Sequence, residues 1–266
     1  MSARVARPAI RVAAVTAAAA LALAASAVRL GADSAPIQPA ARLLPPVVAP
    51  AFTPGEPVRL GSTRHLSRWA AVRRPTTARA APGRSSPTVA ELGRWTAEGT
   101  RNAVAVIERR LDEAGRPWVR VRLAILPNGS TGWVRRTALA GYNTVRTSLD
   151  VDLARLRATL ERDGRPVLRV PIAVGMPGWE TPRGVYYVRN RLTRYRSPAY
   201  GPVAFGTSAR SPAATDWPAG GFVGIHGTDR PDLVPGRVSH GCIRMRNADI
   251  LALARRMAVG TPVVIH

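Results

Sequence analysis

The chain has 266 residues, 46% of them apolar, so it can bury the cores of two ordinary domains or one large one and is not disordered as a whole. Its formal net charge is +23, and all 39 basic residues are arginines spread along the chain. Because they do not cluster beside aromatic side chains, no nucleic-acid partner is indicated, whereas anionic cell-wall polymers are compatible partners. A single cysteine excludes a disulfide framework, and the four histidines (65, 226, 240 and 266) show no metal-binding signature.

Residues 1–30 have the layout of a secretory signal. Three arginines precede the uncharged apolar run 12–28, and Ala25-Ser26-Ala27 supplies small residues typical of a cleavage site. The run is also long enough to stay as an uncleaved anchor, so both a signal peptide and an N-terminal anchor are consistent with it. Either way we expect an exported protein of the periplasmic or cell-wall space. Residues 31–66 follow as a proline-rich, extended linker.

Residues 67–141 contain short strand candidates separated by turn sequences. The clearest is 118–123, in which polar and apolar residues alternate as in a half-buried strand. Several short strands in so few residues are most economically closed into a small β-barrel. The strand candidates are 70–72, 102–109, 118–124 and 132–134, with hairpin turns at 112–115 and 127–129.

Residues 142–266 are predicted to form a second, mostly β domain. Strands are expected at 145–153, 156–161, 167–174, 185–188 and 261–265, with Asp163-Gly164 as a hairpin turn. The stretch 191–220 shows no period and carries Tyr195, Tyr200 and Trp217, so it is interpreted as a functional loop that shields the site. A short helix is expected over 250–257, with Asn247 as its N-cap and Asp249 in its first turn.

The lone cysteine lies in the segment that carries the chemistry, G-I-H-G followed by S-H-G-C-I-R-M. Cys242 comes two residues after His240 and sixteen after His226, and either imidazole could lower the pKa of a nucleophilic thiol from its usual value of about 8.5. The amides of Gly241 and Cys242 could donate to an oxyanion. Arg244 shares the face of Cys242 if this segment is a strand, and could hold a substrate carboxylate.

The pattern H-G-x(11)-S-H-G-C-I-R-M resembles the signature of L,D-transpeptidases with a YkuD-like catalytic domain. The resemblance extends over 142–266 and includes V-D-L (151–153), P-x-A-V-G (171–175) and T-P-x-G (181–184). It implies a mostly β sandwich or barrel with one short C-terminal helix. It also implies Cys242 as acyl acceptor and His226 as general acid and base, although His240 is not excluded as the base by the residues alone. The substrate-binding or oxyanion candidates are Ser239, His240, Gly241, Arg244, Gly227 and Tyr200.

A second resemblance covers 67–141. W-V-R-V from Trp118, followed by N-G-S-T-G-W-V from Asn128, resembles bacterial Src-homology-3-like domains, which are small β-barrels. Such domains either bind wall peptides or act as spacers, and both roles are open for this chain.

The first resemblance implies a reaction on peptidoglycan tetrapeptide stems that uses no cofactor and no metal. Cys242 would attack the carbonyl before the terminal D-Ala, and an amine of a second stem would then take the acyl group to give a 3→3 cross-link. Two alternatives stay open: an L,D-carboxypeptidase or hydrolase that trims stems with water as acceptor, and a non-catalytic wall-binding protein. The sequence does not decide between a stem amine, water, a protein and a polymer as acceptor.

Overall fold

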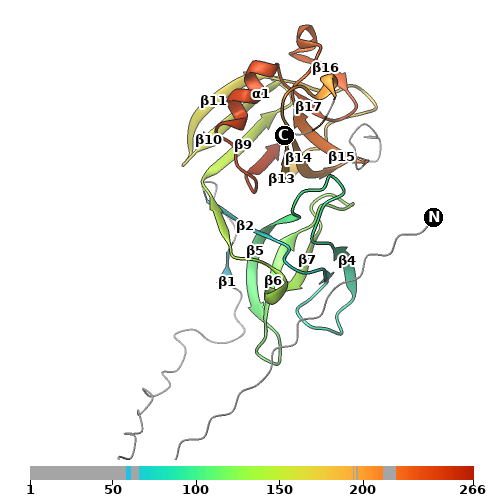
Figure 1. Cartoon of the computed structure of the whole chain (residues 1–266), viewed down its shortest axis with the longest axis vertical. Coiled ribbons are helices and arrows are strands. Elements are labelled where there is room, and N and C mark those ends of the chain that lie inside the picture. Colours follow the sequence, from blue (N-terminus) through green and yellow to red (C-terminus); the bar gives the residue numbers. More distant parts are fainter. Residues whose placement is uncertain (1–57, 61–65, 194, 196, 212–219) are drawn as a thin grey trace, which may run out of the picture. The chain divides into compact units, whose positions relative to one another are not determined.

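The structure is a computed structural model that describes residues 58–60, 66–193, 195, 197–211 and 220–266 (Figure 1). These residues form two β-sheets, three short 3-10 helices and one α-helix, so the predicted mostly β fold class is confirmed. The expected signal or anchor, most of the expected linker, His65 and Trp217 lie outside the described residues.

The first sheet has the strand order β4-β3-β7-β6-β5-β2-β8, and β1 pairs with β5. Its strands are β1 (Val58–Arg59), β2 (Ser67–Ala71), β3 (Thr76–Arg79), β4 (Thr88–Leu92), β5 (Ala103–Leu111), β6 (Pro117–Arg122), β7 (Thr131–Arg135) and β8 (Asn143–Val145). Its core is mainly valine from β5, β6 and β7, a β-branched residue that packs well in strands. The sequence did not predict β3 and β4, because these short, partly exposed segments carry few large apolar residues.

The second sheet has the order β11-β10-β9-β18-β13-β14-β15-β17-β12-β16. Its strands are β9 (Thr147–Asp152), β10 (Arg157–Arg162), β11 (Arg165–Pro171), β12 (Ala173–Gly175), β13 (Gly184–Leu192), β14 (Ala204–Arg210), β15 (Phe222–His226), β16 (Gly236–Ser239), β17 (Ile243–Arg244) and β18 (Pro262–Ile265). Helix α1 (Asn247–Ala254) packs against β11 and adds its buried residues to the same core. The turn between β10 and β11 is the predicted one: Asp163 and Gly164 have φ angles of 49° and 77°, as a two-residue hairpin turn requires.

The two sheets follow each other closely in the chain. β8 pairs with β2, so residues 143–145 lie in the first sheet, and β9 opens the second sheet at Thr147. The predicted boundary, with the second domain starting at residue 142, would separate β8 from the sheet in which it pairs. The domain boundaries stay a prediction.

Three local predictions differ from the structure. Strand β14 lies within the stretch 191–220 that was predicted to be irregular; all but its last residue are buried, so its sequence shows no alternation between a polar and an apolar face. Asn247 is the first residue of α1, and Arg246 occupies the N-cap position. Asp249 lies in the first turn, as predicted, but the helix ends at Ala254.

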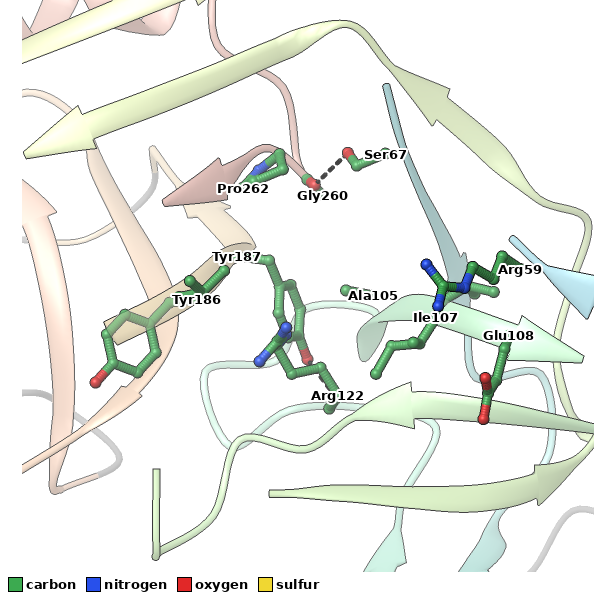
Figure 2. Close-up of a pocket in the computed structure, with 12 residues that line it drawn as sticks. Arg59, Ser67, Ala105, Ile107, Glu108, Arg122, Tyr186, Tyr187, Gly260 and Pro262 are labelled. Carbon is green, nitrogen blue, oxygen red and sulfur yellow. Dashed lines mark hydrogen bonds between the residues drawn. The ribbon is translucent and has the colours of Figure 1, made fainter. Parts of the chain in front are cut away.

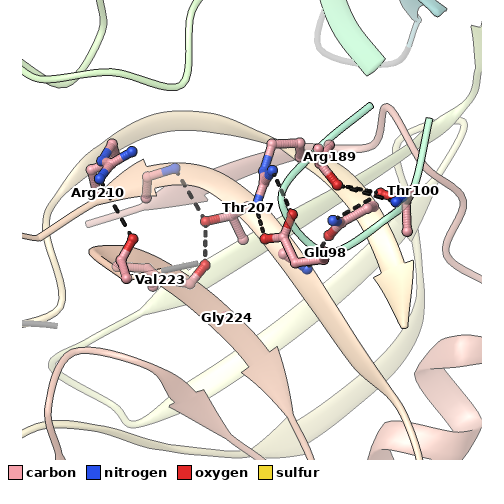
Figure 3. Close-up of polar contacts among 12 residues, drawn as sticks. Glu98, Thr100, Arg189, Thr207, Arg210, Val223 and Gly224 are labelled. Carbon is pink, nitrogen blue, oxygen red and sulfur yellow. Dashed lines mark hydrogen bonds and ion pairs between the residues drawn. The ribbon is translucent and has the colours of Figure 1, made fainter. Parts of the chain in front are cut away.

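Buried polar contacts join the first sheet and its loops to strand β13 (Figure 3). Arg189 forms an ion pair with Glu98 through both carboxylate oxygens, with 3.1 Å between Nη1 and Oε2, and the two side chains are only 5% and 2% exposed. Next to this pair, the amide of Asn190 donates to the hydroxyl of Thr100 at 3.1 Å. The ion pair is thus withdrawn from water and depends on both partners.

Strand β15 begins at Phe222, whose ring lies close to two guanidinium groups. The Cζ atoms of Arg189 and Arg210 lie 3.9 and 4.2 Å from the ring centroid, which is within the range of cation–π attraction. The side chain of Asn128 bonds the backbone of Arg210 through its amide nitrogen at 2.7 Å and its oxygen at 2.9 Å. Glu98 and Asn128, both in the N-terminal half, therefore hold the two arginines that contact Phe222.

Glu98→Gln is expected to lower the free energy of unfolding by about 3–5 kcal/mol, because it leaves the Arg189 charge buried without its counter-charge. Urea unfolding of the full chain measures the loss. Glu91→Gln is the matched control: Glu91 accepts a hydrogen bond from Thr77 at the surface, and its loss should cost less than about 0.5 kcal/mol. Equal losses in the two variants would contradict the importance of the buried pair.

Candidate active site

The predicted catalytic residues lie at neighbouring strands of the second sheet, His226 at the end of β15 and Cys242 just before β17. β15 and β17 are parallel, and His226 is in register with Arg244. Cys242 directly precedes β17, and its Sγ accepts a hydrogen bond from the backbone N–H of Gly224 at 3.3 Å. The register of β15 with β17 sets Arg244 beside His226, and the hydrogen bond to Sγ sets Cys242 beside Gly224. The structure therefore brings the thiol, the imidazole and the guanidinium to one region.

His226 is buried, with 3% of its surface exposed, and its ring is held on two sides. Nδ1 lies 2.6 Å from the carbonyl oxygen of Gly227. A carbonyl only accepts, so Nδ1 carries the hydrogen, and in the neutral ring Nε2 carries the lone pair. The ring of Tyr200 packs against the imidazole at an angle of 61°, with 4.5 Å between centroids. The carbonyl of Gly227 thus fixes the tautomer of His226, and its predicted role in binding substrate or an oxyanion stays a prediction.

Asn247 fixes the chain that leaves His226. Its Oδ1 accepts the backbone N–H of Thr228 at 3.0 Å. A Cβ atom on Gly227 would lie 2.3 Å from this oxygen, so only glycine allows the approach. The sequence predicts that Asn247 caps its own helix. In the structure its side chain instead bonds Thr228, which lies 19 residues earlier in the chain.

The nucleophile candidate sits at the end of a tight turn closed by Ser239. The fully buried Ser239 hydroxyl donates to the carbonyl of Cys242 at 2.6 Å and accepts the N–H of Gly241 at 3.2 Å. Gly241 has a φ angle of +105°, which disfavours any residue with a side chain. The amide of Gly241, predicted as an oxyanion donor, is thus engaged by Ser239, and both residues shape the turn.

Thr181 connects three motifs that are far apart in the sequence. Its hydroxyl donates to the carbonyl of Gly241 and accepts the N–H of Gly175, both at 2.9 Å, and the residue is 4% exposed. A Cβ on Gly175 would lie 2.1 Å from the carbonyl oxygen of Trp179, so the turn between β12 and β13 also requires glycine here. The T-P-x-G motif is visible in the sequence, but nothing in it indicates this role of Thr181.

His240 lies outside the strands, in the bend between β16 and β17. A continuous strand would set His240 on the same face as Cys242, but the turn at Gly241 interrupts the alternation between them. Its ring packs on Trp179, with 4.5 Å between centroids. This contact places His240 against the loop that carries Thr181.

Arg244 and Tyr200 complete the surroundings of the two catalytic candidates. Arg244 is half-buried, and its Nε has no hydrogen-bond partner among the atoms of the described residues. A buried donor without a partner suits a carbonyl or carboxylate oxygen of a ligand. Tyr200 is held by the hydroxyl of Tyr195, which donates to the carbonyls of Tyr200 and Gly201 at 3.2 and 2.9 Å. In the part of the chain that the structure describes, no group of three or more His, Cys, Asp or Glu side chains is placed to hold a metal ion.

Comparisons with known proteins match the second sheet. A family model described as the L,D-transpeptidase catalytic domain, YkuD, matches residues 146–265. The "Putative L,D-transpeptidase YkuD" of Bacillus subtilis is 36% identical over 123 residues, which cover 46% of this chain and 68% of the relative. The "Probable L,D-transpeptidase ErfK/SrfK" of Salmonella typhimurium is 33% identical over 162 residues, 53% of this chain and 50% of the relative.

Among solved structures, the NMR structure of the catalytic domain from the E. faecium L,D-transpeptidase is 30% identical. The match covers 45% of this chain and 96% of that domain, with a TM-score of 0.35. The chain spans about half the length of the Salmonella relative. The similarity to the family model lies in residues 146–265 and does not extend over the whole chain.

Proposed function

The chain belongs to the L,D-transpeptidase family, and on this basis we propose that it forms 3→3 cross-links between peptidoglycan stems through a thioester on Cys242. The observation that carries this assignment is the pairing of β15 with β17. It places the only thiol of the chain one strand away from an imidazole whose Nε2 carries the lone pair. A thiol nucleophile with a neighbouring base is the arrangement that acyl transfer through a covalent intermediate needs.

In the first half of the proposed reaction, Nε2 of His226 takes the thiol proton of Cys242 as Sγ bonds to the carbonyl carbon before the terminal D-Ala. The C–N bond breaks, and the proton passes from His226 to the departing amine of D-Ala. The N–H of Gly224, which reaches Sγ at 3.3 Å, stabilises negative charge on the sulfur before attack.

In the second half, an amine of another stem attacks the thioester and gives its proton to His226. The new C–N bond forms, the C–S bond breaks, and the proton returns to the thiolate of Cys242. Water would compete with the amine in an open site. The ring of Tyr200 covers one side of His226, and we propose that it limits the access of water there.

Arg244 is the proposed contact for the stem peptide. Its half-buried guanidinium is in register with His226 and has an Nε without a partner in the described structure. A carboxylate or carbonyl oxygen of the stem would satisfy this donor and orient the scissile bond. Ser239 and Gly241 are proposed to shape the backbone turn before Cys242, and Gly227 to orient the ring of His226 through its carbonyl.

Thr181→Val is expected to slow acylation of Cys242 by about ten- to a hundredfold, because the Gly241 carbonyl loses its donor and the turn before the nucleophile shifts. The rate of carbapenem adduct formation, followed by mass spectrometry, measures the effect. Thr181→Ser keeps the hydroxyl and should restore the rate to within about threefold of the original. If serine fails as badly as valine, the hydroxyl is not what positions the turn.

We propose that the first sheet is a bacterial Src-homology-3-like barrel with a positioning role. Support comes from its short antiparallel strands and from the buried contacts of Glu98 and Asn128 with β13 and β14. A module tied by a buried ion pair is a fixed support rather than a swinging spacer.

The proposed location is outside the cytoplasm, in the periplasmic or cell-wall space, with 1–30 as signal peptide or anchor. The proposal rests on the sequence of that segment and on the substrate proposed above. In the described residues, no helix is both long and apolar enough to cross a membrane. A net charge of +23 also favours contact with anionic wall polymers.

Product analysis tests the proposed reaction. The full chain is incubated with a disaccharide-tetrapeptide, and the muropeptides are identified by mass spectrometry. A dimer that has lost one D-Ala supports transfer. Tripeptide alone indicates hydrolysis, and unchanged tetrapeptide indicates a binding protein; either result overturns the transferase assignment.

A further inference from the structure

A cavity of about 320 Å³ lies between strand β5 of the first sheet and strand β13 of the second (Figure 2). Its polar and charged lining includes Arg59, Glu108, Arg122 and Tyr187, and the exposed Val185 also lines it. In the sheet order, β13 is separated from β17 by β14 and β15. The cavity is therefore distinct from the site around Cys242, and its volume lies in the range of small-molecule pockets.

The two arginines of this cavity differ in their surroundings: Arg59 is exposed and lies opposite Glu108 in the pairing of β1 with β5, whereas Arg122 is half-buried. Neither Arg59 nor Arg122 forms an ion pair with a carboxylate within the described ranges. Arg122 is half-buried, and burial, together with repulsion from Arg120, lowers the pKa of its guanidinium. The one acidic residue of the lining, Glu108, is engaged by Arg120 at 3.5 Å. A half-buried cation without a partner is costly, and a bound anion would remove that cost.

The walls of the cavity are fixed by hydrogen bonds between the sheets. The buried hydroxyl of Tyr187 lies 3.2 Å from the carbonyl oxygen of Ala103 and 3.4 Å from that of Arg122. The same burial raises the pKa of Tyr187 to about 12, so the hydroxyl keeps its hydrogen. Ser67 donates to the carbonyl of Gly260 at 3.2 Å. Because both walls are held, the cavity exists before any ligand arrives.

We propose that this cavity binds the oxyanion group of a small ligand, a carboxylate or a phosphate, through Arg59 and Arg122. The planar guanidinium group presents paired donors that match both kinds of oxyanion. With Glu108 in the lining, the three charged side chains sum to +1, so a singly charged anion fits best. A ligand held here contacts strands of both sheets and stabilises their association.

Titration of the full chain, labelled with 15N-arginine, tests the proposal. N-acetyl-D-alanine supplies a carboxylate and dimethyl phosphate a singly charged phosphate, each at about 0.15 M salt to screen weak surface binding. The side-chain N–H signals of Arg59 and Arg122, assigned from the Gln variants, should shift together and saturate. The probe that saturates at lower concentration identifies the source of the oxyanion.

Arg122→Gln should weaken binding by tenfold or more, and Arg122→Lys, which keeps the charge without the planar fork, by less. Val185→Glu changes only an exposed wall residue, 47% exposed, and should weaken binding by adding a negative charge at the cavity. Arg116→Gln removes the same charge outside the cavity and should leave the affinity unchanged.

Two results would overturn the site. One is a titration in which arginine signals all over the surface move alike without saturation. The other is an Arg116→Gln variant that loses as much affinity as Arg122→Gln. The measurement reads binding and not transfer, so its outcome is separate from that of the proposed reaction.

Discussion

Cys242→Ala is expected to lower acylation and transfer by at least about a thousandfold, to below detection, while the fold stays intact. The thiol is the proposed acyl acceptor, and the chain contains no second cysteine to replace it. Its side chain is small and 6% exposed, so alanine leaves little empty space and should shift the thermal midpoint by only a few degrees. Mass spectrometry of the carbapenem adduct and of muropeptide dimers measures the two activities.

Cys242→Ser serves as the matched comparison. It keeps the shape and an acceptor for the N–H of Gly224, but a hydroxyl is a far weaker nucleophile at neutral pH. Serine should therefore be nearly as inactive as alanine. Cross-linking by the alanine variant would remove Cys242 from the mechanism altogether.

His226→Ala should slow acylation by about a hundredfold or more, the usual scale for a lost general base. It should also move the alkylation of Cys242 to higher pH, because no imidazole on β15 is left to favour the thiolate. Alkylation reports on one site without further mutagenesis, since Cys242 is the only cysteine. The rate of iodoacetamide labelling against pH is the deciding measurement.

His240→Ala is the comparison for His226→Ala. His240 packs on Trp179 and lies in the bend before Gly241, so its loss should reduce turnover by disturbing the loop. The labelling of Cys242 at low pH, which we call the low-pH limb of the rate profile, should remain. The reverse pattern, with the limb kept in His226→Ala and lost in His240→Ala, would exchange the roles of the two histidines.

The sequence predicts those parts of the fold whose pattern is local. The strand pattern predicted over 156–161 and the Asp163-Gly164 turn are enough to place β10, β11 and their hairpin. Strand β14 escapes prediction because both of its faces are buried, which only the neighbouring strands β13 and β15 bring about.

In the site, too, features with a local sequence pattern are predictable and features that depend on distant contacts are not. Cys242 and His226 stand out because the motif and the lone cysteine are visible in the sequence. The role of Thr181 is not visible, since its hydroxyl joins Gly241 across 60 residues, and neither end of that contact has a local signature. The Gly241 turn also could not be foreseen from strand periodicity, and it is what separates His240 from the face of Cys242.

The contacts of Phe222 with Arg189 and Arg210 limit which N-terminal modules can be joined to this catalytic half in a chimeric protein. Strand β15 starts at Phe222 and ends at His226, so the ring anchors the strand that presents the proposed base. Its two arginines are held by Glu98 and Asn128, which belong to the other half of the chain. A chimera that joins this catalytic half to a foreign N-terminal module must therefore supply an acid and an amide in equivalent places. Without them, the two arginines lose their partners and β15 loses its anchor.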